Sequence, residues 1–547
     1  MRIRVKGLGF WFLVPLLAAA GLAAPSADQR LVTAAKEKDK EAVRSLLRQR
    51  ADVNARQADG ATALHWAAHW DDLETADLLI RAGAQVNTAN DYGATPLSVA
   101  CTNGNASMVE RLLTAGANPN SALPSGETAL MRCARTGSVE GVKSLLARGA
   151  DTSAKDIEQG QTALMWAVSQ KHPDVAQALI AKGADIHARS KGGFTPLLFA
   201  ARVGDIGSAR VLLEAGADVN EPMPAPPAPE NPGNRSASSV PSPEEVSLGT
   251  MTPLLLASAS GQEAFAIFLL EKGANPNARD QSGATALHYA VLKGITALNG
   301  VVLANYVSHF YRPNMLELVK ALLAHGANPN VRLVKTPSVG GRSGKTPVGA
   351  TPFLLAAATP DVAIMRILAA GGADPLLATK ANLTPLMAAT GVNRAQDLTD
   401  EEKREALEAV KLAAELGNDV NAANEDRLTA MHGAASNGAD PIVQFLADRG
   451  AKLDVKDKYQ QTPLSVASGV RLPWIPYGDE LGEIIRKSTA ELLLKLGATP
   501  LTTPGYFTPV EGSEAYRFNQ SQRYQGLSPE QYEGVKPQRP EGVTPPR

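Results

Sequence analysis

A short phrase, Thr-Pro-Leu or Thr-Ala-Leu, constrains the fold of this chain more than any other feature, because it returns eleven times. The copies begin at Thr62, Thr95, Thr128, Thr162, Thr195, Thr252, Thr285, Thr351, Thr384, Thr429 and Thr462, with Phe353 and Met431 as the two exceptions to leucine. Successive copies are 33, 33, 34, 33, 57, 33, 66, 33, 45 and 33 residues apart. This spacing predicts one supersecondary unit stacked many times, with insertions where the gap is longer.

The residues that follow each phrase predict two short helices per repeat. Thr95 can cap a helix, and Pro96 fits the first helical position, where its missing N–H has no partner to lose. A narrow face of small side chains follows, and a second apolar stretch at 108–113 ends before Gly116, which readily adopts positive φ. Aromatic residues make up only 5% of the chain, which suits closely packed short helices.

This pattern resembles the ankyrin repeat. The matching segments include Thr62-Ala63-Leu64-His65-Trp66-Ala67-Ala68 and Thr285-Ala286-Leu287-His288-Tyr289-Ala290, and the closing segments Gly216-Ala217-Asp218-Val219-Asn220 and Gly273-Ala274-Asn275-Pro276-Asn277. The resemblance covers about residues 29–500 and implies an all-α solenoid of stacked helix pairs with β-hairpin-like fingers. With its terminal cap, the array should contain about twelve repeats.

The chain divides into five segments by composition and pattern. We expect a signal peptide at 1–24, repeats at 25–220, a Pro/Ser-rich inserted loop at 221–248, repeats with inserted loops at 249–500, and a disordered Pro/Tyr/Gln-rich tail at 501–547. Residues 29–60 lack the threonine phrase and read as an N-terminal cap.

The first residues have the layout of a secretory signal. Arg2, Arg4 and Lys6 precede an apolar stretch at 8–22 that ends in small residues. An uncleaved membrane anchor is the alternative, although the stretch is short for a full span. We therefore expect an exported protein, periplasmic or secreted, with no membrane insertion after cleavage.

The charge balance disfavours nucleic-acid binding. The formal net charge is −1, and removal of Arg2, Arg4 and Lys6 would make it −1 − 3 = −4. A protein that neutralises phosphates needs a basic face, and no run of lysine and arginine supplies one.

Distances within repeats locate the insertions. The fingers that precede Thr252 and Thr351 are enlarged, and the connection between the two helices is enlarged in the repeats of Thr285, Thr384 and Thr462. Two of these connections contain apolar and aromatic stretches, at 295–311 and at 470–477, so the three insertions could pack against one another or form a binding ledge.

The two cysteines are expected to be core filler. Cys101 and Cys133 occupy places where other repeats carry small residues such as Ala67 and Ala68. Helices of adjacent repeats pack about 8–10 Å apart, which is too far for a disulfide unless the two side chains converge.

Catalytic and cofactor signals are weak. Gly344-Lys345-Thr346 is similar to the end of a phosphate-binding loop, but Val339 stands where the first glycine is needed. His65 and His69 lie at i and i+4 and could form a metal pair, yet the repeat pattern itself accounts for His65. We expect no catalytic residues, no metal and no cofactor.

The resemblance implies function through a concave surface that binds proteins. In the family this surface is formed by residues seven and eight after the threonine and one, three and four before it. The large side chains at those positions are His69, Trp70, Tyr92, Arg135, Phe194, Arg202 and Tyr459. We therefore predict a non-enzymatic, monomeric scaffold that binds an unidentified protein partner. An enzyme or metal-dependent accessory that uses the C-terminal insertions is the alternative.

Overall fold

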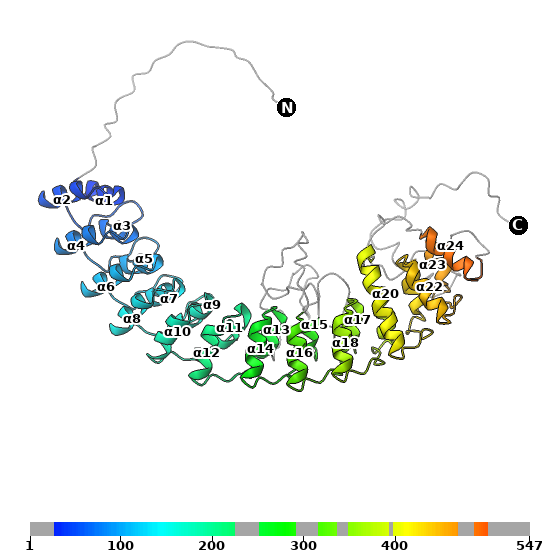
Figure 1. The fold of residues 1–547 in the computed structure, drawn as a ribbon. Coiled ribbons are helices and arrows are strands. Elements are labelled where there is room, and N and C mark those ends of the chain that lie inside the picture. The colour runs from blue at the N-terminus through cyan, green and yellow to red at the C-terminus, as the bar shows by residue number, and fades with distance from the viewer. Residues whose placement is uncertain are drawn as a thin grey trace, which may run out of the picture. The chain divides into compact units, whose positions relative to one another are not determined.

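A computed structural model describes residues 27–224, 251–291, 315–335, 348–392, 398–468 and 486–500. These ranges contain helices and no strands, as the all-α prediction requires (Figure 1). The chain separates into two compact units between Lys191 and Gly192, inside the regular stretch of repeats. None of the described helices is both long and apolar enough to cross a membrane.

The described part of unit 1, residues 27–191, contains five helix pairs. They are α1 (Ala27–Glu37), α2 (Lys40–Arg48), α3 (Ala63–His69), α4 (Leu73–Arg81), α5 (Pro96–Asn103), α6 (Ala106–Thr114), α7 (Ala129–Arg135), α8 (Val139–Ala147), α9 (Ala163–Ser169) and α10 (Pro173–Ile180).

Unit 2 continues the same alternation of first and second helices. Its helices are α11 (Pro196–Val203), α12 (Ile206–Glu214), α13 (Pro253–Ala259), α14 (Glu263–Glu271), α15 (Ala286–Val291), α16 (Leu316–Ala324), α17 (Pro352–Ala358), α18 (Val362–Ala370), α19 (Pro385–Ala389), α20 (Asp400–Glu415), α21 (Ala430–Ser436), α22 (Asp440–Asp448), α23 (Pro463–Ala467) and α24 (Lys487–Lys495).

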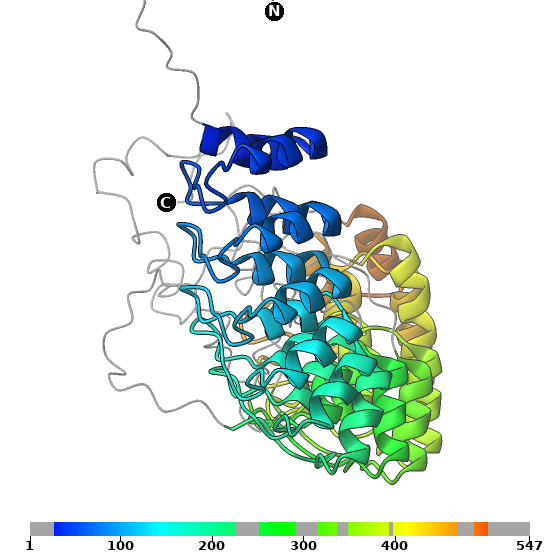
Figure 2. The ribbon, with the colours of Figure 1, turned by 90° about the vertical axis from the view of Figure 1, so that its left-hand side faces the viewer.

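Each unit has two layers of helices. In unit 1 the odd-numbered helices pack side by side as a first-helix layer, and the even-numbered helices form a second layer behind it (Figures 1 and 2). Small buried residues such as Ala67, Ala68 and Ala134 line the first-helix layer and let adjacent helices approach closely. The same alternation of contacts holds from α11 to α24.

The threonine of the repeated phrase caps the first helix, as predicted. The hydroxyl of Thr95 accepts a hydrogen bond from the N–H of Ser98 (3.2 Å), and Ser98 Oγ accepts one from the N–H of Thr95 (2.9 Å). His65 replaces this serine in the repeat of Thr62, where its Nδ1 accepts from the threonine N–H at 3.1 Å. His288 and His432 do the same in their own repeats. This explains why a threonine and a serine or histidine recur three residues apart.

Asparagines of the closing motif join consecutive repeats. Asn87 accepts the N–H of Asn118 (2.7 Å) and donates Nδ2 to the carbonyl of Gly116 (3.0 Å) in the next repeat. The same pair of bonds is made by Asn54, Asn120, Asn220, Asn277, Asn330 and Asn421. At Ser153 the hydroxyl bonds only to Asp151 of its own turn, so this junction lacks the asparagine link. These bonds therefore tie each of these repeats to the next whether or not an insertion separates them.

The predicted fingers are hairpin-like turns that stack on one another. In the finger before Thr95, the N–H of Asn90 bonds to the carbonyl of Ala94 (2.9 Å). The N–H of Asp91 then bonds to the carbonyl of Asp59 in the preceding finger (2.9 Å). Figure 2 shows these loops projecting from one side of the helices of unit 1.

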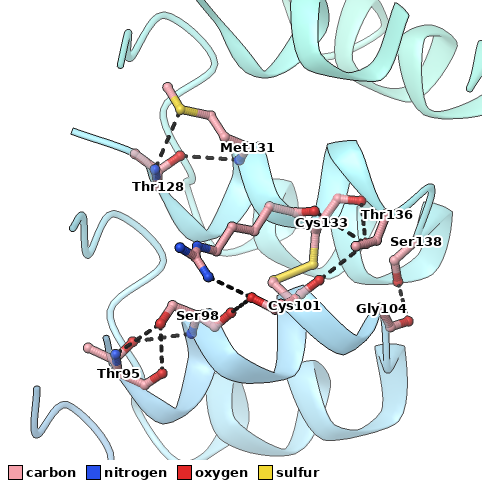
Figure 3. The surroundings of a disulfide bond; sticks show 11 residues. Thr95, Ser98, Cys101, Gly104, Thr128, Met131, Cys133, Thr136 and Ser138 are labelled. Carbon is pink, nitrogen blue, oxygen red and sulfur yellow. Dashed lines mark hydrogen bonds between the residues drawn. A yellow bond between two sulfur atoms is a disulfide. The ribbon is translucent and has the colours of Figure 1, made fainter. Parts of the chain in front are cut away.

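A disulfide bond joins Cys101 of α5 to Cys133 of α7, so the expectation of two unbridged core cysteines was wrong (Figure 3). Both residues are fully buried, and their Cα atoms are only 4.5 Å apart. The 8–10 Å estimate described helix axes, whereas these two residues face each other between axes brought close by small side chains.

Polar contacts reinforce the junction around this disulfide (Figure 3). Thr136 Oγ1 donates to the carbonyl of Cys101 (3.1 Å), and Ser138 Oγ donates to the carbonyl of Gly104 (2.8 Å). Gly141 leaves room for the bridge, because a Cβ there would lie 3.2 Å from Cys133 Sγ. The α5–α7 junction is thus linked both covalently and by hydrogen bonds.

The insertion in the repeat of Thr384 lengthens the second helix. α20 has 16 residues where most second helices have 9, and a capping box of Thr399 and Glu402 starts it. Asn437 Oδ1 accepts the N–H of Leu398 at 3.1 Å, which ties the insertion to the following repeat. Part of the expected loop is therefore helix, packed against α17 as well as its neighbours.

Several predictions concern residues outside the described ranges. These are the signal peptide at 1–24, nearly all of the loop at 221–248, most of the insertions after Thr285 and Thr462, Gly344-Lys345-Thr346, and the tail at 501–547. They stay predictions.

Candidate functional site

Four of the seven predicted site residues lie at the C-terminal ends of first helices. His69 ends α3, and Trp70 is its C-cap. Arg135 ends α7, and Arg202 lies in the last turn of α11. Cations are favourable at these ends because the helix dipole is negative there. Three of these residues therefore lie along one edge of the first-helix layer of unit 1, and Arg202 holds the equivalent position in the first repeat of unit 2.

Trp70 belongs to an aromatic cluster against the N-terminal cap. The ring stacks on Trp66 with centroids 6.4 Å apart and meets His69 edge-on at 4.5 Å. Lys38 Nζ lies 3.9 Å from the Trp70 centroid, and Trp70 Nε1 donates to the carbonyl of Lys36 (2.9 Å). The indole nevertheless stays 39% exposed. Anchored, partly exposed tryptophan is a typical hot-spot residue of protein interfaces.

Arg135 stacks on an aromatic ring two helices further along unit 1. Its guanidinium carbon lies 5.0 Å from the ring centroid of Trp166 in α9. Glu127, which precedes the capping Thr128, lies 3.7 Å from Arg135 and 3.0 Å from Arg132. The arginine is thus held by a π face and shares a carboxylate.

Phe194 and Arg202 come together at the start of unit 2. The guanidinium carbon of Arg202 lies 5.2 Å from the ring centroid of Phe194 and 4.9 Å from that of Phe199. The two rings are 5.3 Å apart. Burial lowers the pKa of Arg202. The structure therefore brings these two predicted residues into contact and adds Phe199.

Tyr92 and Tyr459 lie on fingers, away from the helix ends. Tyr92 is 72% exposed. Tyr459 is half-buried, with Lys458 Nζ 5.3 Å from its ring, and Lys458 also pairs with Asp426 (3.0 Å). The hydrogen bond to Asp426 raises the pKa of Lys458.

A row of aromatic residues four positions after the threonine was not predicted from the sequence. Their polar groups bond to finger side chains: Trp66 Nε1 to Gln57 Oε1 (3.1 Å), Trp166 Nε1 to Asp156 Oδ2 (3.4 Å) and the Tyr289 hydroxyl to Asp280 Oδ2. Phe199 occupies the same position without a polar group. The sequence could have indicated this row. The fourth residue after the threonine lies one helical turn before the eighth, which was already assigned to the binding surface, so the two side chains share a helix face.

The repeat of Thr462 shows what this pairing does. Asp457 accepts the N–H groups of Tyr459 and Gln461 through Oδ1, both at 2.8 Å. Val466 stands where other repeats have an aromatic donor, and Asp457 Oδ2 is buried without a hydrogen-bond partner. Burial accordingly raises the pKa of Asp457.

The remaining first-helix ends described in unit 2 carry small residues. The seventh and eighth positions hold Ala259, Ser260, Ala358, Thr359, Gly391, Val392, Ser436 and Asn437. Among the described first-helix ends, large side chains at these positions thus occur in unit 1 and in the first repeat of unit 2.

The His65 and His69 pair does not suit a metal ion. Both ring nitrogens of His65 are engaged, Nδ1 by Thr62 and Nε2 by the carbonyl of Ala94 (3.0 Å). His65 is buried whereas His69 is exposed, and burial lowers the pKa of His65. Within the described residues, no group of three or more metal-ligating side chains could hold a metal.

The family model for ankyrin repeats matches six spans of the chain, at 31–122, 71–156, 100–190, 130–223, 239–308 and 402–473. Together these spans cover more than half of the sequence, so the chain belongs to the ankyrin repeat family. Repeats of this family mediate protein–protein interactions, and the resemblance drawn from the threonine phrase is confirmed.

Curated relatives share this repeat region at low identity. The chain is 27% identical over 292 residues to the E3 ubiquitin-protein ligase KEG of Arabidopsis thaliana, covering 51% of this chain and 16% of that protein. It is 27% identical over 257 residues to Rabankyrin-5 of Homo sapiens, covering 47% of this chain and 17% of that protein. The chain therefore matches about a sixth of the length of each relative.

Proposed function

We propose that this protein is an exported, non-enzymatic scaffold that binds a protein partner through its first-helix layer and fingers, the concave groove used by the family. The observation that carries the proposal is the set of arginine and lysine side chains stacked on aromatic rings along that layer. These residue types dominate the energetics of protein interfaces. A preformed repeat surface also lowers the ordering cost of association.

Export is supported by two independent features. The first residues have the layout of a secretory signal, and the chain's two cysteines form a disulfide between buried positions. Disulfides persist in oxidising compartments such as the periplasm and the exterior and are rare in the cytosol. Cell fractionation with thiol alkylation tests this: cytosolic protein with two reactive thiols would contradict export.

Affinity capture tests the binding surface. The mature chain should retain a partner from an extract of its own cells, and Trp70→Ala and Arg135→Ala should each reduce recovery about tenfold or more. Arg111→Ala is the matched control, because Arg111 is an exposed cation of the second-helix layer that pairs with Asp77 at 2.9 Å. Equal recovery by all four proteins would place the interface elsewhere.

A further inference from the structure

Arg135 and Arg202 occupy the same place in their repeats, seven residues after Thr128 and Thr195. Both lie in the last turn of a first helix, and the guanidinium carbon of each lies over an aromatic ring, 5.0 Å from the Trp166 centroid and 4.9 Å from the Phe199 centroid. The two arginines therefore hold the same position in their repeats, one in each unit, although Arg135 lies over a ring of the following repeat and Arg202 over rings of its own.

The two copies differ in their carboxylate. Glu127 stands one residue before Thr128, and its carboxylate lies 3.7 Å from the guanidinium of Arg135. Phe194 stands one residue before Thr195, so this repeat has an aromatic ring where the other has an acid. Among the described residues, no carboxylate pairs with Arg202, and burial is the sole cause that lowers its pKa.

A half-buried cation without an anion is an unusual arrangement, because charges removed from water are normally paired. The contacts of Arg202 with the rings of Phe194 and Phe199 do not use its N–H groups as hydrogen-bond donors to a carboxylate. The N–H edge is left for in-plane, bidentate hydrogen bonds to a carboxylate. The site thus has apolar walls and a donor edge but no acceptor from its own repeat.

We propose that Arg202 binds a carboxylate of the protein partner, an aspartate or glutamate side chain whose apolar neighbours contact Phe194 and Phe199. The partner's acid takes the place that Glu127 fills for Arg135. Charge complementarity selects this occupant, because the site offers one cation and two rings. This inference rests on the proposed function and specifies what the partner must present.

A peptide selection tests the inference even though the partner is unidentified. Short random peptides displayed on phage are selected on the immobilised full chain, and the enriched peptides are synthesised and titrated by fluorescence anisotropy. We expect enriched peptides that contain aspartate or glutamate beside apolar residues. Arg202→Gln should weaken their binding about 10-fold to 100-fold, because one charged hydrogen-bonded pair is lost.

Arg210→Gln is the matched control for Arg202→Gln. Arg210 is an exposed arginine of α12 in the same repeat, and it also stacks on a phenylalanine, with 5.5 Å to the ring of Phe268. It belongs to the second-helix layer, so its replacement should leave peptide binding unchanged. Replacing acidic residues of the peptides by their amides should weaken binding as much as Arg202→Gln does.

Phe194→Glu provides a second test, because it rebuilds in this repeat the pair seen between Glu127 and Arg135. The new carboxylate should occupy Arg202 and weaken acidic peptides about tenfold more than the isosteric Phe194→Gln, which lacks the charge. Equal affinities for these two variants would overturn the inference.

The remaining outcomes separate this inference from the proposed function. Peptides that lack acids, or that bind Arg202→Gln as well as the original chain, overturn the carboxylate site while the scaffold proposal stands. No enrichment on the original chain contradicts the scaffold proposal itself. Displacement of the peptides by a synthetic copy of residues 501–547 would identify the chain's own tail as the occupant and overturn the assignment to a partner.

Discussion

The two units are built from one repeat but use it differently. In unit 1, α1 to α10 follow one another without long insertions, a disulfide crosses one junction, and the ends of α3 and α7 carry His69, Trp70 and Arg135. In unit 2 the insertions interrupt the pairs, and most first-helix ends that the structure describes carry small residues. Unit 1 therefore has a regular scaffold with a specialised surface, whereas unit 2 has a plainer layer with altered connections.

This contrast shows that one repeat can be varied at two independent places. Side chains at the helix ends change the surface without touching the core, whereas insertions between helices leave the threonine cap intact. Thr384 still caps α19, with its hydroxyl 3.2 Å from the N–H of Met387, although a long insertion follows. Recognition and architecture can therefore diverge separately along the array.

The largest expected effect is on the free energy of unfolding of unit 1, which contains the disulfide. Replacing Cys101 and Cys133 together by serine should destabilise unit 1 by about 3–4 kcal/mol, because the bridge closes a loop of about 32 residues in the unfolded chain. Trp66, Trp70 and Trp166 all report on unit 1, so guanidinium unfolding can follow it by emission in a Trp474→Phe background.

The measurement also tests whether the units unfold separately. The circular dichroism change assigned to unit 2 should keep its midpoint in the double serine variant. A parallel shift of both transitions would show that the two units unfold as one and would break the comparison between them.

Acid should weaken unit 2 through its buried histidines. Burial lowers the pKa of His288 and His432 to about 4, below the usual value of 6.5. The unfolded chain therefore binds more protons between about pH 6.5 and pH 4, and the free energy of unfolding falls as pH decreases through that window. The loss should be roughly 2–3 kcal/mol for each histidine.

Serine is the matched replacement for these histidines, because Ser98 and Ser465 make the same cap in their own repeats. His288→Ser and His432→Ser should flatten the dependence on pH, as measured by urea unfolding from pH 7 to pH 4. A slope that is unchanged in the double variant would show that other groups control acid sensitivity.

Each asparagine link between repeats should contribute less to the free energy of unfolding than the disulfide or a buried histidine does. Asn87→Ala removes two bonds to the next repeat and should destabilise unit 1 by about 1–2 kcal/mol. Ser153→Asn supplies a missing link and should stabilise it by about 0.5–1 kcal/mol. Unfolding midpoints of the two variants should move in opposite directions; movement in the same direction would contradict the role given to these asparagines.

The smallest expected effect concerns the unpaired carboxylate oxygen of Asp457. Val466→Tyr would place a hydroxyl where Tyr289 bonds to Asp280, and should stabilise unit 2 by about 0.5–1 kcal/mol. Val466→Phe is the control, because it adds the ring without the donor. If both variants have the same stability, the hydroxyl does not reach the carboxylate.

Much of the fold was predictable because the repeat is encoded by contacts between near neighbours. The cap of Thr95 on Ser98 spans three residues, and the proline after many of these threonines marks a helix start. Of the predicted site residues, Arg202 and Phe194 lie in contact, but the role of these residues in binding stays a prediction. The sequence pattern could not show which of these side chains would find a charged partner within the protein, as Arg135 does in Glu127.

The sequence by itself determined the stacked helix pairs, the capped helix starts and the positions that carry the exposed surface, because these depend on a periodic local pattern. Only the tertiary structure decided that Cys101 bonds to Cys133, that aromatic residues four positions after the threonine are held by finger side chains, and that Arg202 lacks the carboxylate given to Arg135. These features depend on distances of a few ångströms between residues of different elements. A repeat period brings such residues near each other but does not state which atoms meet.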